Sequence, residues 1–121
     1  MALLEDYYAK IDKGDLGAAV DLLAEDLEFS MILPLGESRG RGRGRMRAYL
    51  DGRPPVDRKH VVLRAAADRD LEFVHGEVTE RGTTVTGYFV GTAHVNSAGL
   101  IDRYQVVFSA DFGMVPGADT R

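Results

Sequence analysis

The sequence predicts an α+β fold in which a cone-shaped, curved antiparallel β-sheet wraps around N-terminal helices. Three observations predict it. Apolar residues near the N-terminus recur at helical spacing, and the second half of the chain alternates with a period of two. Glycines also interrupt the predicted strands, where a sheet that curls needs to bend. A sheet curved in this way leaves a cavity between itself and the helices.

The N-terminal segment predicts two helices separated by Gly14-Asp15. Glycine ends the first helix and aspartate caps the second. The apolar stripe of the first helix consists of Leu3, Leu4, Tyr7, Tyr8 and Ile11. The buried face of the second consists of Leu16, Ala19, Val20, Leu22 and Leu23.

Residues 27–33 alternate between two faces and predict the first strand, which Pro34 and Gly36 end. A polar loop rich in glycine and arginine is expected over residues 36–45, followed by a short helix over 45–50. Four strands in series then complete the fold, over residues 60–67, 71–79, 83–95 and 100–111. Their connections are short and carry Asp, Gly or Asn, as hairpin loops do. The glycines inside these strands are Gly76, Gly87 and Gly91.

Length and composition indicate one domain over residues 1–112 and a flexible C-terminal tail over 113–121. The net charge of −4 argues against nucleic acid or an anionic membrane as a partner. Without cysteine there is no disulfide and no thiol nucleophile. The acidic N-terminus does not look like a signal peptide, and no apolar run approaches the roughly 20 residues of a membrane span. We therefore expect a cytoplasmic protein.

With these elements in this order, the chain resembles the nuclear transport factor 2-like superfamily, whose fold is also called cystatin-like. That group includes ketosteroid isomerases, SnoaL-type polyketide cyclases and limonene epoxide hydrolases. The resemblance spans residues 3–112 and implies the cone-shaped sheet. Because this fold hosts many chemistries, it implies little about the reaction. The matching features are the Gly14-Asp15 helix end, the run LLAEDLEF over 22–29, Pro34-Leu35-Gly36, the Gly-Arg entry to the third helix and the AGLIDRY hairpin over 98–104.

The resemblance implies that this chain has one of the three catalytic side chains of ketosteroid isomerases. The oxyanion-donating tyrosine of that family corresponds to Tyr7. Its aspartate base corresponds to Met31, or to Leu33 if the loop is shifted, and its second oxyanion donor corresponds to Gly91. None of these last residues can take a proton, so we expect no ketosteroid isomerase activity by that mechanism.

Other members of the superfamily place an acid on the last strand. The epoxide hydrolase position corresponds to Val106, which is apolar, and the nearest candidate for the cyclase acid is Asp102. We expect Asp102 and Tyr104 to share a strand face with Val106 and Phe108. Alternatively, Asp102 lies just outside the hairpin, solvated and paired with an arginine.

The implied cavity would bind a flat hydrophobic molecule, with no cofactor, oriented by Tyr7. No metal site is expected, because the three histidines lie on separate strands without a carboxylate at ligand spacing. His75 and His94 are expected to point away from the cavity, whereas His60 reaches its rim. The predicted ligand-binding residues are Leu27, Phe29, Met31, Val74, Val78, Phe89, Tyr104 and Phe108.

Two functions remain open at this point. The first is a protein that binds a hydrophobic small molecule without the usual acid/base set. The second is an isomerase, cyclase or lyase acting beside a carbonyl, in which Tyr7 polarises the oxygen and Asp102 or His60 shuttles the proton. A dimeric interaction module is a third possibility. We also expect a homodimer through the outer sheet face, which should carry Tyr88, Val90, Thr92 and Val107.

The segment from Arg39 to Arg47 alternates arginine with glycine. Such a segment is either a mobile, solvated loop or a site for an anion or for the acidic surface of a partner. The sequence does not decide between these two interpretations.

Overall fold

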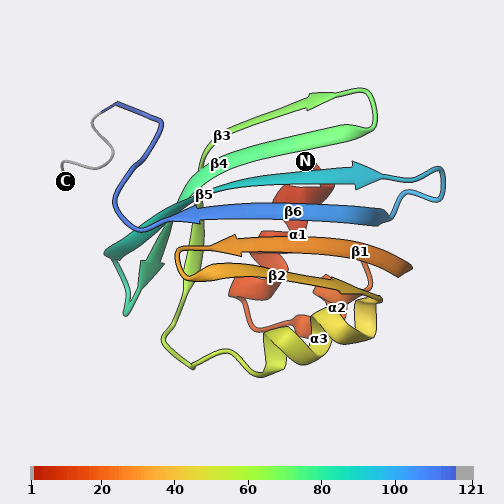
Figure 1. Ribbon diagram of the computed structural model, residues 1–121, viewed down its shortest axis with the longest axis horizontal. Coiled ribbons are helices and arrows are strands. Elements are labelled where there is room, and N and C mark those ends of the chain that lie inside the picture. Colours follow the sequence, from red (N-terminus) through yellow and green to blue (C-terminus); the bar gives the residue numbers. More distant parts are fainter. Residues whose placement is uncertain (1, 117–121) are drawn as a thin grey trace.

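The computed structural model describes residues 2–116, which form three helices and one six-stranded sheet (Figure 1). The helices are α1 (Leu3–Asp12), α2 (Leu16–Val20) and α3 (Arg43–Asp51). The strands are β1 (Leu23–Leu33), β2 (Gly36–Arg41), β3 (Lys59–Asp68), β4 (Leu71–Glu80), β5 (Thr84–Val95) and β6 (Ile101–Ser109).

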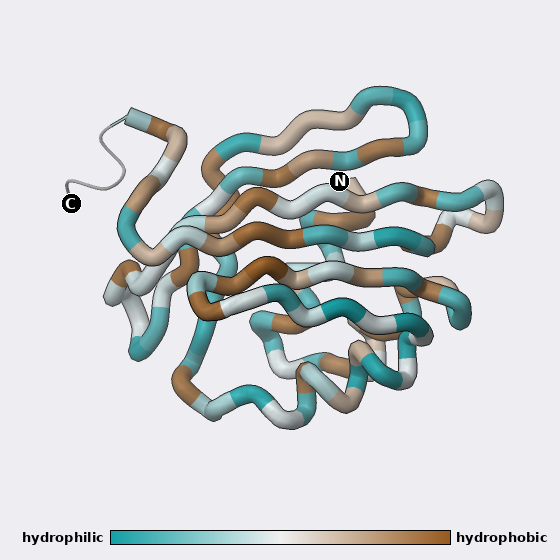
Figure 2. The backbone as a smooth tube through the Cα atoms, viewed as in Figure 1, coloured by the Kyte–Doolittle hydropathy of each residue, from teal (hydrophilic) through white to brown (hydrophobic). Residues whose placement is uncertain are grey.

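The predicted α+β fold is confirmed, with the curved sheet packed against the N-terminal helices (Figure 1). The strand order is β2-β1-β6-β5-β4-β3. All neighbours are antiparallel except β1 and β6, which run parallel, so the sheet is mixed rather than wholly antiparallel. Hydrophobic residues gather in the middle of the central strands, where the sheet covers the core (Figure 2).

Helix α1 is docked against the sheet at both of its ends. The Glu72 carboxylate on β4 accepts hydrogen bonds from the backbone N–H groups of Leu4 at 2.8 Å and Leu3 at 3.3 Å. A carboxylate at a helix N-terminus satisfies free N–H groups and complements the helix dipole. At the other end, the Asp12 carboxylate accepts the backbone N–H of His60 on β3 at 2.6 Å. The predicted apolar stripe faces the core, and its buried residues are Leu4, Tyr7, Tyr8 and Ile11.

The prediction of a loop over residues 36–45 was wrong for its first half, because Gly36–Arg41 forms β2 and pairs antiparallel with β1. Polar cross-strand contacts hold this edge strand. Glu37 accepts a hydrogen bond from Ser30 at 2.5 Å, and Arg41 pairs with Glu28 at 3.4 Å. Cross-strand contacts of this kind depend on the partner strand and cannot be recognised from the sequence of the segment alone.

The arginines of this segment are largely paired with carboxylates. Arg39 contacts Glu37 at 2.5 Å, Arg43 contacts Glu25 at 3.5 Å and Arg47 contacts Asp51 at 3.2 Å. These neighbours offset the positive charge, which weakens the interpretation of the segment as an anion site.

The second helix is shorter than predicted. It ends at Val20, and Leu23, which we placed on its buried face, begins β1. Leu23 is nevertheless fully buried. A buried apolar residue fits a helix or a strand equally well, so its pattern does not distinguish the two.

Gly76 allows two strands to approach closely, as expected for a glycine inside a strand. A Cβ atom there would collide with the carbonyl oxygen of Val61 and with the ring of Phe89. The pairing of β3 and β4 shifts register next to this point, between Val62 and Arg64. The glycine therefore belongs to the bend of the sheet.

The prediction that Asp102 shares a face with Tyr104 was wrong. The register of β5 and β6 shifts between His94 and Val95, which leaves Asp102 as an extra residue in the ladder. Such a bulge breaks the alternation of side chains. Asp102 therefore contacts Nδ1 of His94 at 2.5 Å, while Asp70 contacts Nε2 of the same ring at 2.8 Å.

The end of the described chain folds back on the outer face of the sheet. The backbone N–H of Met114 donates to Nε2 of His75 at 3.1 Å. Gly113 lies against the ring of Tyr88, which is buried although we expected it on an apolar outer face. The predicted flexible tail over 113–121 lies beyond the described residues from 117 onward. None of the helices within residues 2–116 is long and apolar enough to cross a membrane.

The close approach of β3 and β4 at Gly76 implies that a side chain at this position destabilises the fold. Gly76→Ala should destabilise the fold by about 1–3 kcal/mol, because the added methyl group has no space against backbone. Equilibrium denaturation in urea would measure this change in the free energy of unfolding. Gly44→Ala on α3 is the matched control, since a Cβ at that position meets no atom within 4 Å. Equal stability of the two variants would contradict the explanation.

The contacts of His94 imply that the stability of the fold depends on pH. Hydrogen bonds to Asp102 and then to Asp70 raise the pKa of His94 above its ordinary value. Because the folded pKa exceeds the unfolded value of about 6.5, the stabilisation is complete below that pH and is lost as pH rises through the folded pKa. Melting temperatures between about pH 6 and pH 9 should therefore fall more for the natural protein than for His94→Gln. Parallel curves for the two proteins would contradict this assignment.

Candidate functional site

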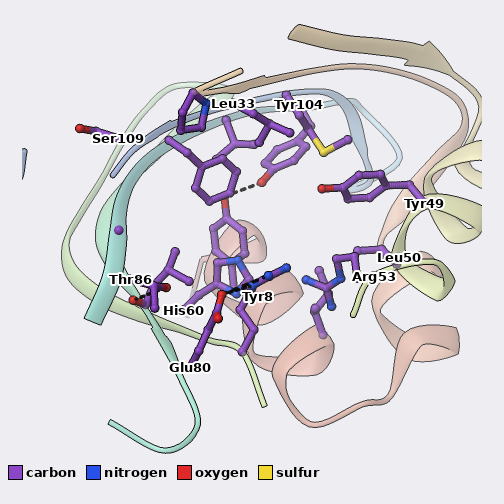
Figure 3. Close-up of a pocket in the computed structure, with 18 of the residues that line it drawn as sticks. Tyr8, Leu33, Tyr49, Leu50, Arg53, His60, Glu80, Thr86, Tyr104 and Ser109 are labelled. Carbon is purple, nitrogen blue, oxygen red and sulfur yellow. Dashed lines mark hydrogen bonds and ion pairs between the residues drawn. The ribbon is translucent and has the colours of Figure 1, made fainter. Parts of the chain in front are cut away.

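A cavity of about 340 Å³ lies between the concave face of the sheet and the helices. Figure 3 shows side chains entering it from the sheet on one side and from α1 and α3 on others. Its apolar lining includes Ile11, Met31, Leu33, Met46, Leu50, Val78, Val106 and Phe108. Its polar lining includes Tyr7, Tyr8, Tyr49, Arg53, Arg58, His60, Glu80, Thr86, Tyr104 and Ser109. A mainly apolar cavity with a few polar groups is typical of small-molecule sites.

His60 enters the cavity wall as half of a histidine–carboxylate pair. Its Nδ1 lies 2.8 Å from Oδ1 of Asp12, and both side chains are nearly buried. The other Asp12 oxygen accepts the backbone N–H of His60, so one carboxylate fixes both the ring and the strand. An ionised carboxylate only accepts, so Nδ1 carries a proton, and in the neutral imidazole Nε2 keeps its lone pair. The described residues offer Nε2 no hydrogen-bond partner.

Aromatic contacts hold the His60 ring in place. It stacks on Tyr8 with ring centroids 4.6 Å apart and an interplanar angle of 19°. It meets Phe89 edge to face at 5.2 Å. The imidazole therefore has its orientation set by packing as well as by Asp12.

Tyr8 also occupies the space above Gly91. A Cβ at Gly91 would collide with the Tyr8 hydroxyl oxygen. That hydroxyl lies 2.7 Å from the hydroxyl of Tyr104. One phenol donates to the other, and the accepting phenol keeps a proton that it can donate to a ligand.

Tyr7, Tyr8 and Tyr104 are neutral donors in the cavity. Burial is the main cause that raises the pKa of Tyr7, Tyr8 and Tyr104 well above the ordinary value. The Arg53 guanidinium lies near enough to Tyr7 to oppose that shift in its pKa without cancelling it. Among the residues described, the Tyr7 hydroxyl has no hydrogen-bond partner. It is therefore available to a ligand.

The structure brings part of the predicted site together. Tyr7, His60 and the predicted ligand-binding residues Met31, Val78, Tyr104 and Phe108 all line the cavity. Four other predicted ligand-binding residues pack in the core without lining it, namely Leu27, Phe29, Val74 and Phe89. Phe89 shows the reason: it packs edge to face against Tyr8, whose ring comes between this part of the sheet and the cavity. Asp102 is not part of the lining, since the bulge turns it to His94.

The sequence analysis missed Asp12, Tyr49 and Arg53. Asp12 could have been recognised from the sequence, because it follows Leu4 and Tyr8 at intervals of four residues and therefore lies on the same face of the predicted helix. A carboxylate on an apolar stripe needs a partner. Tyr49 and Arg53 flank the end of a short helix, and nothing in their spacing indicates a cavity. Within residues 2–116, no cluster of His, Cys, Asp and Glu is arranged to hold a metal ion.

Several solved structures share this fold. An NTF-2 like protein of unknown function from Burkholderia xenovorans LB400 superposes with a TM-score of 0.74 at 20% identity, over 98% of this chain and 88% of that one. A candidate ketosteroid isomerase from Kribbella flavida DSM 17836 gives 0.73 at 23% identity, over 98% and 83%. An LEH-like epoxide hydrolase from M. tuberculosis gives 0.72 at 20% identity, over 88% and 80%. These identities support a common fold and no more.

The search of curated proteins found no match. A family comparison, however, matches residues 4–104 to the SnoaL-like domain. The match includes α1, β1 and most of the cavity wall, and it agrees with the resemblance that we inferred from the sequence. The chain therefore belongs to the SnoaL-like domain family.

Proposed function

We propose that the cavity binds a hydrophobic small molecule carrying a carbonyl group, and that His60 moves a proton on it. The observation that carries this proposal is that His60, in the wall of a mainly apolar cavity, is paired with the Asp12 carboxylate. A histidine held by a carboxylate, with its second nitrogen free, is a common general base. SnoaL-like membership agrees with an isomerase, cyclase or related protein of this class.

The proposed reaction uses groups of the cavity wall together with Asp12, which contacts His60. In a ligand with a β,γ double bond, Nε2 of His60 removes a proton from the carbon beside the carbonyl. The electron pair of that C–H bond forms a carbon–carbon double bond to the carbonyl carbon, and the π pair of the carbonyl moves onto its oxygen to give a dienolate. Asp12 stabilises the resulting imidazolium, and the neutral Tyr7 hydroxyl donates a hydrogen bond to the developing enolate. The imidazolium of His60 then gives the proton to the γ-carbon of the dienolate; the carbonyl re-forms, and the double bond has moved from the β,γ to the α,β position. The positions of the ketosteroid isomerase acids, Met31 and Gly91, take no part.

A general probe can test whether His60 is a base in this cavity. Base removes the C3 proton of 5-nitrobenzisoxazole, the N–O bond breaks, and a coloured phenolate nitrile forms. We expect the protein to accelerate this ring opening and His60→Gln to lose roughly 10² to 10⁴-fold of the rate. Asp12→Asn should also lower the rate, because its amide can donate to Nδ1 and favour the wrong tautomer.

The matched control is His94→Gln, which removes a histidine from the outer face of the sheet. Its rate should equal that of the natural protein. If His60→Gln retained the full rate, the base would lie elsewhere and the cavity would be assigned to binding alone.

We also propose that the protein forms a homodimer through the outer sheet face. Val90 and Val107 pair across β5 and β6, and each remains 41% exposed. Phe73 on the neighbouring strand is 37% exposed. Tyr88 no longer contributes, since residues near Gly113 cover it. Exposed apolar side chains on adjacent strands are typical of an interface.

A charged pair of substitutions tests this interface. Val90→Glu with Val107→Glu should convert a dimer into a monomer at micromolar concentration, because four like charges would face each other across the two-fold axis. Sedimentation velocity gives the mass directly. Ala48→Glu on the exposed side of α3 should leave the dimer intact. A monomeric natural protein at this concentration would contradict the proposal.

A further inference from the structure

Arg53 is an unpaired cation in the wall of the cavity. Its Nε is buried and has no hydrogen-bond partner among residues 2–116. Six other arginines contact a carboxylate: Arg39, Arg41, Arg43, Arg47, Arg58 and Arg103. Arg53 has no such contact within the described part of the chain. Desolvating a cationic donor without a partner is costly, so this arrangement needs an explanation.

The other charges of the cavity are already compensated. Arg58 donates to Glu80 at 3.1 and 3.2 Å, which makes a neutral pair. His60 is held by Asp12. The guanidinium of Arg53 is therefore the cavity's uncompensated charge among the side chains that are described.

Tyr49 provides a second donor beside Arg53. The two residues are four apart at the end of α3, and Figure 3 shows both side chains pointing into the cavity from the α3 side. Among residues 2–116, the Tyr49 hydroxyl has no hydrogen-bond partner. In Figure 3, Tyr8 and His60 lie across the cavity from these two donors. The cavity thus has a base on one wall and a cationic donor set on another.

We propose that Arg53, with Tyr49, binds a carboxylate group of the ligand. The ligand is then a hydrophobic acid whose carboxylate lies against α3 while its carbonyl group lies toward His60. The planar guanidinium suits a carboxylate, and a charge-assisted hydrogen bond is strong in an apolar cavity. The inference rests on the proposed function, because it takes this cavity as the ligand site.

The test uses two probes of nearly the same shape, 2-naphthoate and the neutral 2-naphthamide. Isothermal titration calorimetry at neutral pH, where the carboxylate is ionised, gives both affinities. The natural protein should bind 2-naphthoate at least about tenfold more tightly than 2-naphthamide. Arg53→Gln should abolish that preference and leave the affinity for 2-naphthamide unchanged. Arg53→Lys should keep part of it, because the charge remains without the planar fork.

The matched control is Arg45→Gln, which removes the same charge from an exposed position on the same helix. It should keep the full preference. Equal affinity for both probes in the natural protein overturns the carboxylate site, and that measurement needs no variant to fold. If the same protein still opens 5-nitrobenzisoxazole through His60, only the carboxylate site fails. If neither probe binds, the carboxylate site is overturned, and the proposed function is overturned with it only if 5-nitrobenzisoxazole is not opened either.

Discussion

The docking of α1 into the concave sheet is the contact on which the cavity depends. One helix supplies Tyr7, Tyr8 and Asp12, so its position sets the donor, the aromatic wall and the partner of the base together. Glu72 holds its first turn and Asp12 its last, each by hydrogen bonds to backbone. A shift of one residue would rotate the helix by about 100°, which would turn Tyr7 and Tyr8 out of the cavity and Asp12 away from His60. The two carboxylates therefore define the site as well as the fold.

The parts of the fold that were predicted from sequence are those with a local signal. The stripe of α1, the turn at Gly14 and the alternating strands each depend on neighbours a few residues apart. Strand β2 had no such signal, because its arginines and glycines favour a loop. It forms because β1 offers a partner edge, with Glu28 facing Arg41. Sheet pairing of this kind is a tertiary effect that overrides propensity.

The candidate site was predicted only in part for the same reason. Tyr7 and Tyr104 followed from position on a helix and on a strand. The contact of Asp12 with His60 joins residues 48 apart in sequence and arises only when α1 meets β3. Asp102 was misplaced because a single bulge reverses the face of a residue, and the sequence near it gives no sign of the extra residue. The candidate site therefore depends on contacts between residues far apart in the sequence, and local sequence patterns do not indicate such contacts.

Gly91 contributes to the site because the absence of a side chain there leaves room for the hydroxyl of Tyr8. By resemblance, ketosteroid isomerases hold an acid there, and here any side chain would displace the hydroxyl of Tyr8. Tyr8 in turn bonds to Tyr104 and stacks on His60, the residue that Asp12 orients. A side chain at position 91 and the packed hydroxyl of Tyr8 therefore compete for the same space. A carboxylate at this position would displace Tyr8 and with it part of the packing that holds the imidazole of His60.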